Sequence, residues 1–198
     1  SCTFSNNVGT KGSHLYIASS NGVTITSSTF NMHTGDAIYL SSTKYLILTG
    51  SSFTGISTET GSRGLYLLDV TTSTISSTQF SYHNCKFTNG SGILIESSTT
   101  TSQTHTLSSC TFDNNQADYG GGLGIQATYF NVTVDSSTFT SNSANSKGGA
   151  ISLTSTYLYS FLTISGTSSF SKNAAVYAGG AIFVFGQPAK FSGSAYSF

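Results

Sequence analysis

The sequence of 198 residues carries very little charge and contains no tryptophan. Charged residues make up 7% of the chain, and seven basic side chains balance seven acidic ones, so the formal net charge is zero. Because charges this few and this balanced form no basic surface, we expect no nucleic-acid partner. No apolar run approaches the roughly 18 residues of a membrane helix, so we expect no transmembrane segment.

Proline and the strong helix formers are also scarce. The chain has one proline and one methionine, whereas 68 residues are Ser or Thr, 21 are glycine and 13% are aromatic. Long helices need many Ala, Leu, Glu, Lys and Arg residues, while β-branched and aromatic residues favour strands. The composition therefore predicts an all-β protein. Its aromatic content and zero net charge argue against charge-driven disorder.

A short apolar segment recurs along the chain. It consists of Ile or Leu, then any residue, then Leu, Ile or Val. Its seven copies begin at Leu15, Ile38, Leu65, Ile93, Leu123, Ile151 and Ile182. Successive copies lie 23 to 31 residues apart. Seven copies in phase predict a repeat architecture.

A second segment interleaves with the first and ends in a phenylalanine. These anchor residues are Phe4, Phe30, Phe53, Phe80, Phe112, Phe139 and Phe170. Apolar and polar residues alternate in both segments, which is the period of a β-strand. Each copy is too short to bury its own apolar face, but stacked coils cover one another. We therefore predict that residues 1–198 form a single right-handed parallel β-helix of about seven coils of roughly 28 residues. The alternative, an antiparallel sandwich, does not need a repeat in phase.

Two elements of the repeat resemble those of the chlamydial polymorphic outer-membrane proteins. Phe-x-x-Asn occurs at 4–7, 112–115, 139–142 and 170–173, and Gly-Gly-Ala-Ile occurs at 148–151 and 179–182. Similar repeats occur in surface proteins of some protists and algae. The resemblance is good over 104–184 and looser over 1–100. It implies a surface-displayed β-helix with a structural or adhesive role and no catalysis.

The asparagine of the first element occupies the same turn in several coils. Stacked amides can form a hydrogen-bonded ladder, and asparagine tolerates the left-handed backbone of a turn. The predicted structural turn ladder consists of Asn7, Asn115, Asn142 and Asn173. His33 and His83 replace asparagine in two other coils, with Ile56 between them. We expect these histidines to make turn hydrogen bonds, because a metal site needs several converging ligands.

The carboxylates form no evident catalytic cluster. Enzymes with this fold need grouped carboxylates for acid–base chemistry or for calcium. Register places Asp36 one coil from Arg63, which predicts a salt bridge, although the segment 33–36 superficially resembles a carboxylate site of sugar hydrolases. Asp113 and Asp118 bracket one loop, which is a weak candidate for calcium. We predict no catalytic residue, no metal site and no cofactor.

Two kinds of covalent modification are open to the chain. Cys2 and Cys110 lie four coils, or about 19 Å, apart, which is too far for a disulfide. Cys85 lies in an insertion after Phe80, where the register is ambiguous because Phe87 is a second candidate for the anchor. A Cys85–Cys110 disulfide across adjacent coils is then one alternative, and buried free thiols are the other. Asn89 and Asn131 stand in sequons and are candidate glycosylation sites if a eukaryote secretes the protein.

Two columns of outward-facing side chains are candidate binding surfaces. Tyr16, Tyr39 and Tyr66 share one outward position in three successive coils. Such a stripe can bind sugar rings or another subunit, or it can be an aromatic ladder that stabilises the sheet. A column of threonines on another strand resembles the ice-binding face of some β-solenoids, but Ile47 and Asp135 interrupt the array.

Together these features predict an extracellular or cell-surface protein that forms a rigid structural or adhesive rod or fibre. The alternative is a carbohydrate-binding or carbohydrate-cleaving, pectinase-like β-helix, and the more remote one is an ice-binding β-solenoid. No repeat resembles a capping unit. We therefore expect the chain to be an excerpt of a longer solenoid, or to associate end to end with further β-helix coils. Glycans are the other candidate partners.

Overall fold

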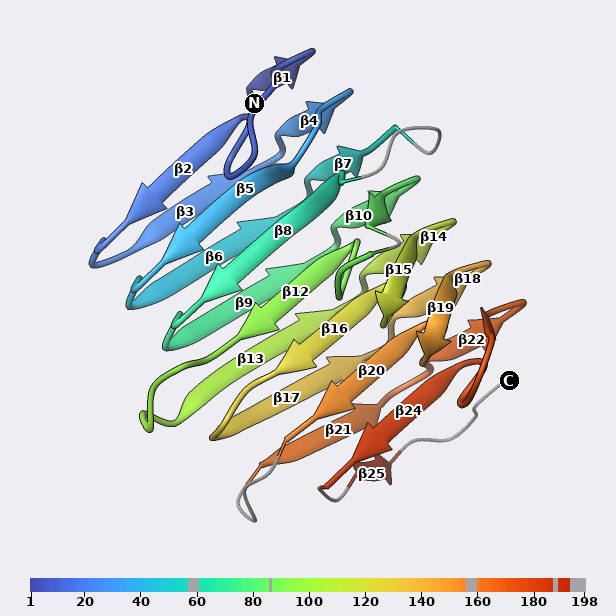
Figure 1. The fold of residues 1–198 in the computed structure, drawn as a ribbon. Helices are drawn as coiled ribbons and strands as arrows, with labels where there is room; N and C mark the ends of the chain where they lie inside the picture. Colours follow the sequence, from blue (N-terminus) through green and yellow to red (C-terminus); the bar gives the residue numbers. More distant parts are fainter. Residues whose placement is uncertain (57–60, 86, 156–159, 187–188, 193–198) are drawn as a thin grey trace.

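The protein is a parallel β-helix (Figure 1). The computed structural model describes residues 1–56, 61–85, 87–155, 160–186 and 189–192. Within these ranges the chain forms 25 strands and no helix. Each named strand pairs in parallel with strands of the neighbouring coils. The predicted all-β coil of about seven turns is confirmed.

Four sheets form the walls of the coil. The Phe sheet, which carries the anchor phenylalanines, contains β1 (Thr3–Ser5), β4 (Thr29–Asn31), β7 (Ser52–Thr54), β10 (Gln79–Ser81), β14 (Thr111–Asp113), β18 (Thr138–Thr140) and β22 (Ser169–Ser171). The Tyr sheet contains β2 (Leu15–Ala18), β5 (Asp36–Ser41), β8 (Arg63–Leu68), β12 (Ile93–Glu96), β16 (Leu123–Gln126), β20 (Ile151–Thr154) and β24 (Ile182–Phe185). The Thr sheet contains β3 (Val23–Thr26), β6 (Tyr45–Thr49), β9 (Thr72–Ser76), β13 (Gln103–Ser108), β17 (Phe130–Asp135), β21 (Phe161–Ser165) and β25 (Ala189–Ser192). The short sheet contains β11 (Asn84–Cys85), β15 (Gln116–Tyr119), β19 (Ser143–Lys147) and β23 (Ala174–Ala175).

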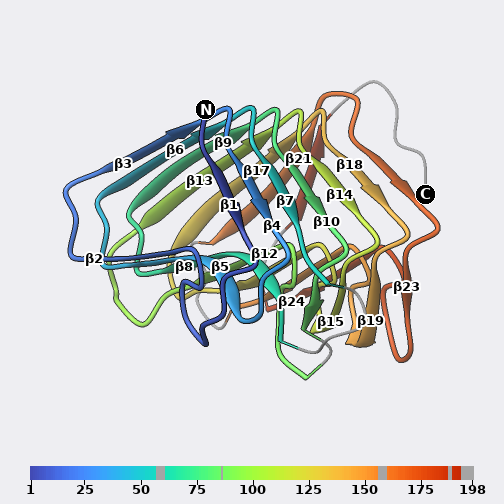
Figure 2. The ribbon, with the colours of Figure 1, turned by 90° about the horizontal axis from the view of Figure 1, so that it is seen from above.

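The three long sheets form the three sides of each coil (Figure 2). The chain passes from the Phe sheet, through the short sheet where it is present, to the Tyr sheet and then to the Thr sheet. The register follows the sequence repeat, since Ile93 pairs with Leu65 on one side and with Leu123 on the other. Equivalent residues of successive coils therefore form continuous columns.

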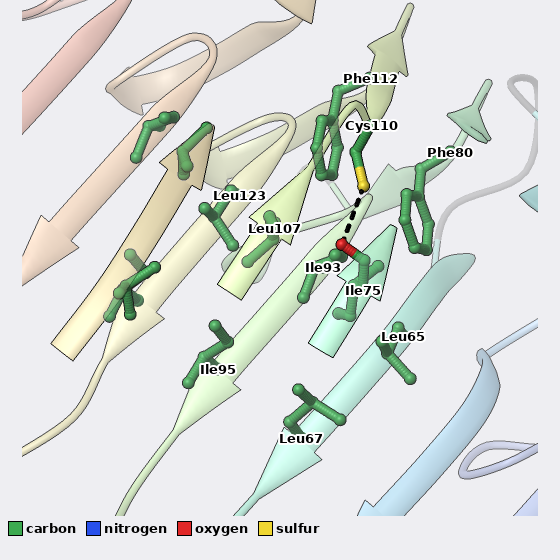
Figure 3. Close-up of a cluster of buried hydrophobic side chains, with 14 of the residues drawn as sticks. Leu65, Leu67, Ile75, Phe80, Ile93, Ile95, Leu107, Cys110, Phe112 and Leu123 are labelled. Carbon is green, nitrogen blue, oxygen red and sulfur yellow. Dashed lines mark hydrogen bonds between the residues drawn. The ribbon is translucent and has the colours of Figure 1, made fainter. Parts of the chain in front are cut away.

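The interior is filled by columns of identical or similar apolar side chains. The anchor phenylalanines stack with their ring centroids 4.5 to 5.2 Å apart. In Figure 3, Leu65 and Ile93 of the Tyr sheet face Ile75 and Leu107 of the Thr sheet across the core. These side chains are fully buried. Truncating a buried phenylalanine such as Phe80 typically costs about 3–5 kcal/mol, so the column is a major source of stability.

Asparagines form the predicted ladder in the C-terminal half of the coil. The Nδ2 of Asn115 donates to Oδ1 of Asn142 at 2.9 Å, and Nδ2 of Asn142 donates to Oδ1 of Asn173 at 3.0 Å. Each amide also donates to the carbonyl of an anchor phenylalanine one coil back, as Asn142 does to Phe112 at 3.0 Å. Backbone N–H groups complete the ladder, since that of Asn115 donates to Oδ1 of Asn142 at 3.1 Å. The prediction is confirmed for these three residues.

Asn7 does not belong to this ladder. It is exposed, and its Nδ2 donates to Nδ1 of His14 at 2.7 Å. The equivalent position in the next coil is His33, which has no amide to continue the chain of hydrogen bonds. The ladder therefore begins only where successive coils carry asparagine.

Hydroxyl groups form a second ladder at the turn before each anchor phenylalanine. Oγ of Ser51 accepts from the N–H of Ser28 at 3.1 Å, and Oγ of Ser137 accepts from the N–H of Cys110 at 3.1 Å. Cys110 itself occupies one position of this ladder. Its thiol contacts the carbonyl oxygen of Ile75 at 3.5 Å (Figure 3) and that of Ser108 at 3.4 Å. A weakly bonding thiol thus replaces a hydroxyl in this coil.

The Cys85–Cys110 disulfide is not formed. All three cysteines are free, and Cys85 and Cys110 are buried. Cys85 lies in the short sheet, where it pairs with Ala117 and its thiol donates to the carbonyl of Ser62 at 3.1 Å. Cys110 lies in the turn between the Thr sheet and the Phe sheet. The two thiols belong to different columns of the coil, so adjacency along the helix axis does not bring them together.

Candidate functional site

The outer face of the Tyr sheet changes from bulky to small side chains along the coil. One outward column runs through Tyr16, Tyr39, Tyr66, Leu94, Gly124, Ser152 and Phe183. The loss of side-chain volume at Gly124 and Ser152 leaves a groove between β12 and β24. This groove has a volume of about 350 Å³, which lies at the lower end of the range for ligand sites.

Aromatic side chains form one wall of the groove. Phe183 and Phe185 project from β24, and Phe185 is 58% exposed. The ammonium group of Lys147 lies 4.6 Å from the centroid of the Phe183 ring, which is a cation–π contact. Tyr119 lies on the same side as Lys147, since the two residues pair across β15 and β19. The wall thus presents apolar ring surface to whatever occupies the groove.

The floor and the rim supply polar groups. Gln126 and Ser152 line the floor from β16 and β20, and Asn89 lines the rim. Gly124 allows the backbone of the rim to pack against β16, because a Cβ at this position would lie 2.8 Å from the backbone nitrogen of Gly90. Amide and hydroxyl groups beside aromatic rings form hydrogen bonds and apolar contacts with the same ligand.

The rim is held in place by Arg63. This guanidinium is buried and donates to the carbonyls of Gly90 and Asn89 at 2.8 and 2.9 Å and to Oγ1 of Thr88 at 3.0 Å. It also forms the predicted salt bridge with Asp36 at 2.6 Å. Burial raises the pKa of Asp36, although the neighbouring Arg63 acts in the opposite direction. Asp36 is therefore a structural counter-ion of the rim.

The tyrosine stripe is an aromatic ladder. Tyr16 and Tyr39 stack at 5.1 Å, and Tyr39 meets the edge of Tyr66 at 4.8 Å. Tyr39 is only 3% exposed, whereas Tyr16 is 57% exposed. The hydroxyl of Tyr66 donates to the carboxylate of Glu96, and burial followed by this contact raises the pKa of Tyr66 well above its ordinary value. Most of the stripe thus stabilises the sheet, and the open surface lies further along the same column.

The two sequons lie on different faces. Asn89 is at the rim of the groove, and Ser91 of its sequon is fully buried with its hydroxyl bonded to the carbonyl of Gly121 at 2.7 Å. Asn131 is exposed on the outer face of the Thr sheet, where it pairs with Thr104. Glycosylation stays a prediction for both sites.

The threonine array is discontinuous. Its central column on the Thr sheet is broken by Ile47, which is 41% exposed. Beside it, the carboxylate of Asp135 accepts a hydrogen bond from Ser165 at 2.7 Å. A charged group and an apolar group within the array disturb the regular hydroxyl spacing that ice binding requires.

A second hollow lies at the turn between the Tyr and Thr sheets. Its lining consists of Ser, Thr, Asn and Gln residues together with Lys44 and Asp69. Asp69 is already occupied, because it accepts hydrogen bonds from the backbone and hydroxyl of Ser98 at 2.9 and 2.8 Å. This hollow has no aromatic wall, so the groove is the better candidate for ligand binding.

Carboxylates and metal ligands do not gather at either place. Among the described residues that line the groove there is no Asp or Glu. No group of three His, Cys, Asp or Glu within the part of the chain that the structure describes is arranged to hold a metal ion. In the proposed calcium loop, Asp113 accepts from the amide of Asn114 at 2.8 Å.

A comparison with protein families identifies the family to which the chain belongs. The family model described as "Right handed beta helix region" matches residues 1–193, which confirms the predicted right-handed coil. The same comparisons found no similar curated protein and no similar solved structure. No helix among the described residues is long and apolar enough to cross a membrane.

Proposed function

The chain belongs to the right-handed β-helix family, and from this premise we propose that it is an extracellular, non-catalytic adhesive rod that binds a glycan in the groove on the Tyr sheet. The observation that carries the proposal is the aromatic-walled groove between β12 and β24, with Phe183 and Phe185 on one side and polar groups at its floor. A fold alone does not define a function, so the proposal rests on this site.

The chemistry of the groove suits a sugar. A sugar ring has an apolar face of C–H groups and a rim of hydroxyls. The rings of Phe183 and Phe185 offer surface for the apolar face, while Gln126, Ser152 and Asn89 offer donors and acceptors for the hydroxyls. The groove is partly open to solvent, which leaves room for a sugar chain to extend from it.

The groove is also rigid. Its floor lies on strands of the Tyr sheet, and Arg63 fixes the rim through three hydrogen bonds. A site built on strands loses little conformational entropy when it binds. A rod of stacked coils transmits tension along its axis through backbone hydrogen bonds, as an adhesive or structural protein requires.

The carboxylates support binding without cleavage. Glycosidases use two carboxyl groups that flank the scissile bond. Asp36 is buried in its salt bridge, and Glu96, one strand from Gln126, is bound by the hydroxyl of Tyr66. Neither is free to act as an acid or a base on a sugar in the groove.

Self-association at the ends of the coil is the second part of the proposal. In the first coil, Leu15 and Ile17 point inward but are only partly buried, as Ile182 and Val184 are in the last described coil of the Tyr sheet. Further β-helix coils, of the same polypeptide or of a second copy, would bury these side chains and pair the strand edges. Negative-stain electron microscopy tests this part, with filaments one coil wide as the expected result and short monodisperse particles as the contrary one.

The glycan proposal is tested with an array of oligosaccharides, followed by titration calorimetry on the best ligand. Phe185→Ala removes an exposed aromatic side chain from the wall of the groove. Phe161→Ala, the matched control, removes a 43% exposed phenylalanine from the Thr sheet. We expect the first variant to weaken binding by about tenfold, equivalent to about 1.4 kcal/mol, and the second to bind as the unmodified protein does. No binding on the array, equal effects of the two variants, or release of shorter sugars would contradict the proposal.

A further inference from the structure

Three histidine rings stack inside the first four coils. His14 and His33 meet edge to face with centroids 5.3 Å apart, and His33 and His83 are also 5.3 Å apart. His33 and His83 stand in the turn that carries the asparagine ladder further along the coil. Two glycines, Gly55 and Gly64, make room for the ring of His83, since a Cβ on either would lie 2.6 or 3.1 Å from its nitrogens.

Two rings of the stack are fully buried, and most of its ring nitrogens lack a well-formed hydrogen bond. His33 and His83 are 0% and 1% exposed, whereas His14 is half-buried. Nε2 of His14, Nε2 of His33 and both ring nitrogens of His83 are buried without a hydrogen bond of good geometry, although the backbone of Asn31 and of Phe53 favours a charge on His14 and His83. Nδ1 of His33 donates to the carbonyl of Gly35 at 3.1 Å, so this ring is neutral when its other nitrogen carries no hydrogen.

No carboxylate among the described residues neutralises the stack. His33 interacts electrostatically with His14, and His83 interacts with His33 and with Arg63, all of which disfavour a positive charge. Asp36 of β5 is the nearest carboxylate along the chain, and it is committed to Arg63. A proton taken up by His33 or His83 is therefore placed in a buried site, near Arg63 in the case of His83, and it disfavours a second proton on the neighbouring ring, which costs free energy.

The other half of the coil is built differently at the same turn. Asn115, Asn142 and Asn173 connect their coils with amides that do not titrate. At this turn, a fall in pH thus acts on the histidine stack and not on the asparagine ladder. His105, buried in the Thr sheet beside Val132, is a separate titrating group. The floor and the aromatic wall of the groove lie in the coils of the asparagine ladder, whereas the rim at Asn89 belongs to the coil of His83.

We propose that the histidine stack is an acid-sensitive switch: in acid it opens the N-terminal coils, while the coils that carry the floor and the aromatic wall of the groove stay folded. Protonated rings repel one another and have no buried anion to pair with among the described residues, so the lowest free energy is reached when these coils separate and the rings meet water. The histidine stack thus determines which coils of the β-helix unfold first as the pH falls.

The pH window follows from the direction of the shifts. Burial lowers the pKa of His33 from 6.5 to about 4 and that of His83 well below 6.5. The unfolded coils therefore take up protons before the folded ones do. The stability that the neutral rings give the N-terminal coils is complete above pH 6.5, and it decreases as the pH falls toward about 4.

Hydrogen exchange measured by mass spectrometry tests the proposal on the full chain. Protection is compared at about pH 7 and about pH 4.5, after correction for the intrinsic exchange rate. We expect protection over residues 15–54 to fall by at least about tenfold in acid while residues 123–154 keep theirs. The double variant His33→Asn/His83→Asn puts amides in the turn and is expected to keep protection over 15–54. The variant His105→Val, which removes a buried histidine outside the stack, is expected to lose it as the unmodified protein does.

Three results would overturn the proposal: protection over 15–54 that does not change with pH, a loss that spreads equally over both regions, or a double variant as acid-sensitive as the unmodified protein. If the double variant does not fold, a ring-nitrogen NMR titration of the unmodified protein decides. Titration of all stack histidines near pH 6.5 with protection intact would refute the proposal, and titration coupled to the loss of protection would support it.

Discussion

Asn142 is the position where the ladder predicts the largest effect of a single polar substitution. Its side chain makes four hydrogen bonds, two as donor to Phe112 and Asn173 and two as acceptor from Asn115. Asn142 and Asn115 are both fully buried, so water cannot replace the lost partners. At about 1 kcal/mol for each hydrogen bond, Asn142→Ala is expected to lower the free energy of unfolding by about 4 kcal/mol.

Urea unfolding followed by circular dichroism measures this loss. Thermal unfolding provides a second measurement. At roughly 2–4 °C per kcal/mol for a chain of this size, the Tm is expected to fall by roughly 8–16 °C. The matched control is Asn131→Ala, which removes an exposed asparagine from a strand and is expected to change stability by less than about 0.5 kcal/mol. A loss below about 1 kcal/mol in Asn142→Ala would refute the view that the ladder stabilises the coil.

Three further predictions concern buried groups outside the groove. In the folded protein a thiol reagent is expected to modify Cys2 alone, because burial raises the pKa of Cys110 to about 11, and modification of Cys110 before unfolding would contradict its burial. His105 has its pKa lowered from 6.5 to about 4 by burial, so the stability that its neutral form provides is complete above pH 6.5 and decreases toward pH 4. Urea titrations should show that His105→Val removes about 2 kcal/mol of the stability lost between pH 7 and pH 5, and an unchanged pH dependence would count against it. Arg63→Met leaves Asp36 buried and unpaired and is expected to cost about 3–5 kcal/mol, with partial recovery in the double variant that also carries Asp36→Asn. Equal stability of the single and double variants would show that the salt bridge is not the cause.

The sequence predicted the coil because the repeat is carried by buried columns. An inward position tolerates few residue types, so Phe80 and Phe112 recur in phase and their pairing follows. The short sheet was not predicted. Its strands are two to five residues long and consist of small and polar residues such as those around Ala117 and Ala144, which carry no alternation of apolar side chains.

The register was uncertain only at the insertion after Phe80. There Phe87 was a second candidate for the anchor, and the structure places it 75% exposed at the surface. The disulfide alternative depended on that insertion. The structure shows the other alternative, buried free thiols, because Cys85 belongs to the short sheet. Insertions are the places where a repeat no longer fixes the position of a residue.

The groove was not predicted, because it depends on outward positions and on a loop. The sequence signal that would have indicated it is the change from tyrosine to Gly124 and Ser152 in one outward column. The rim needs more than a pattern, since the contacts of Arg63 with the backbone of Asn89 and Gly90 exist only in the folded coil. The histidine stack was not predicted for a similar reason. His14 lies outside the turn column in the sequence, and it contacts His33 only in the folded coil.

The most direct test of the proposed function is a crystal structure of the protein with the oligosaccharide that binds best on the array. The proposal predicts a sugar ring against Phe183 and Phe185, with its hydroxyls bonded to Gln126 or Ser152. A sugar bound instead in the polar hollow beside Asp69, or an empty groove at saturating ligand, would contradict it.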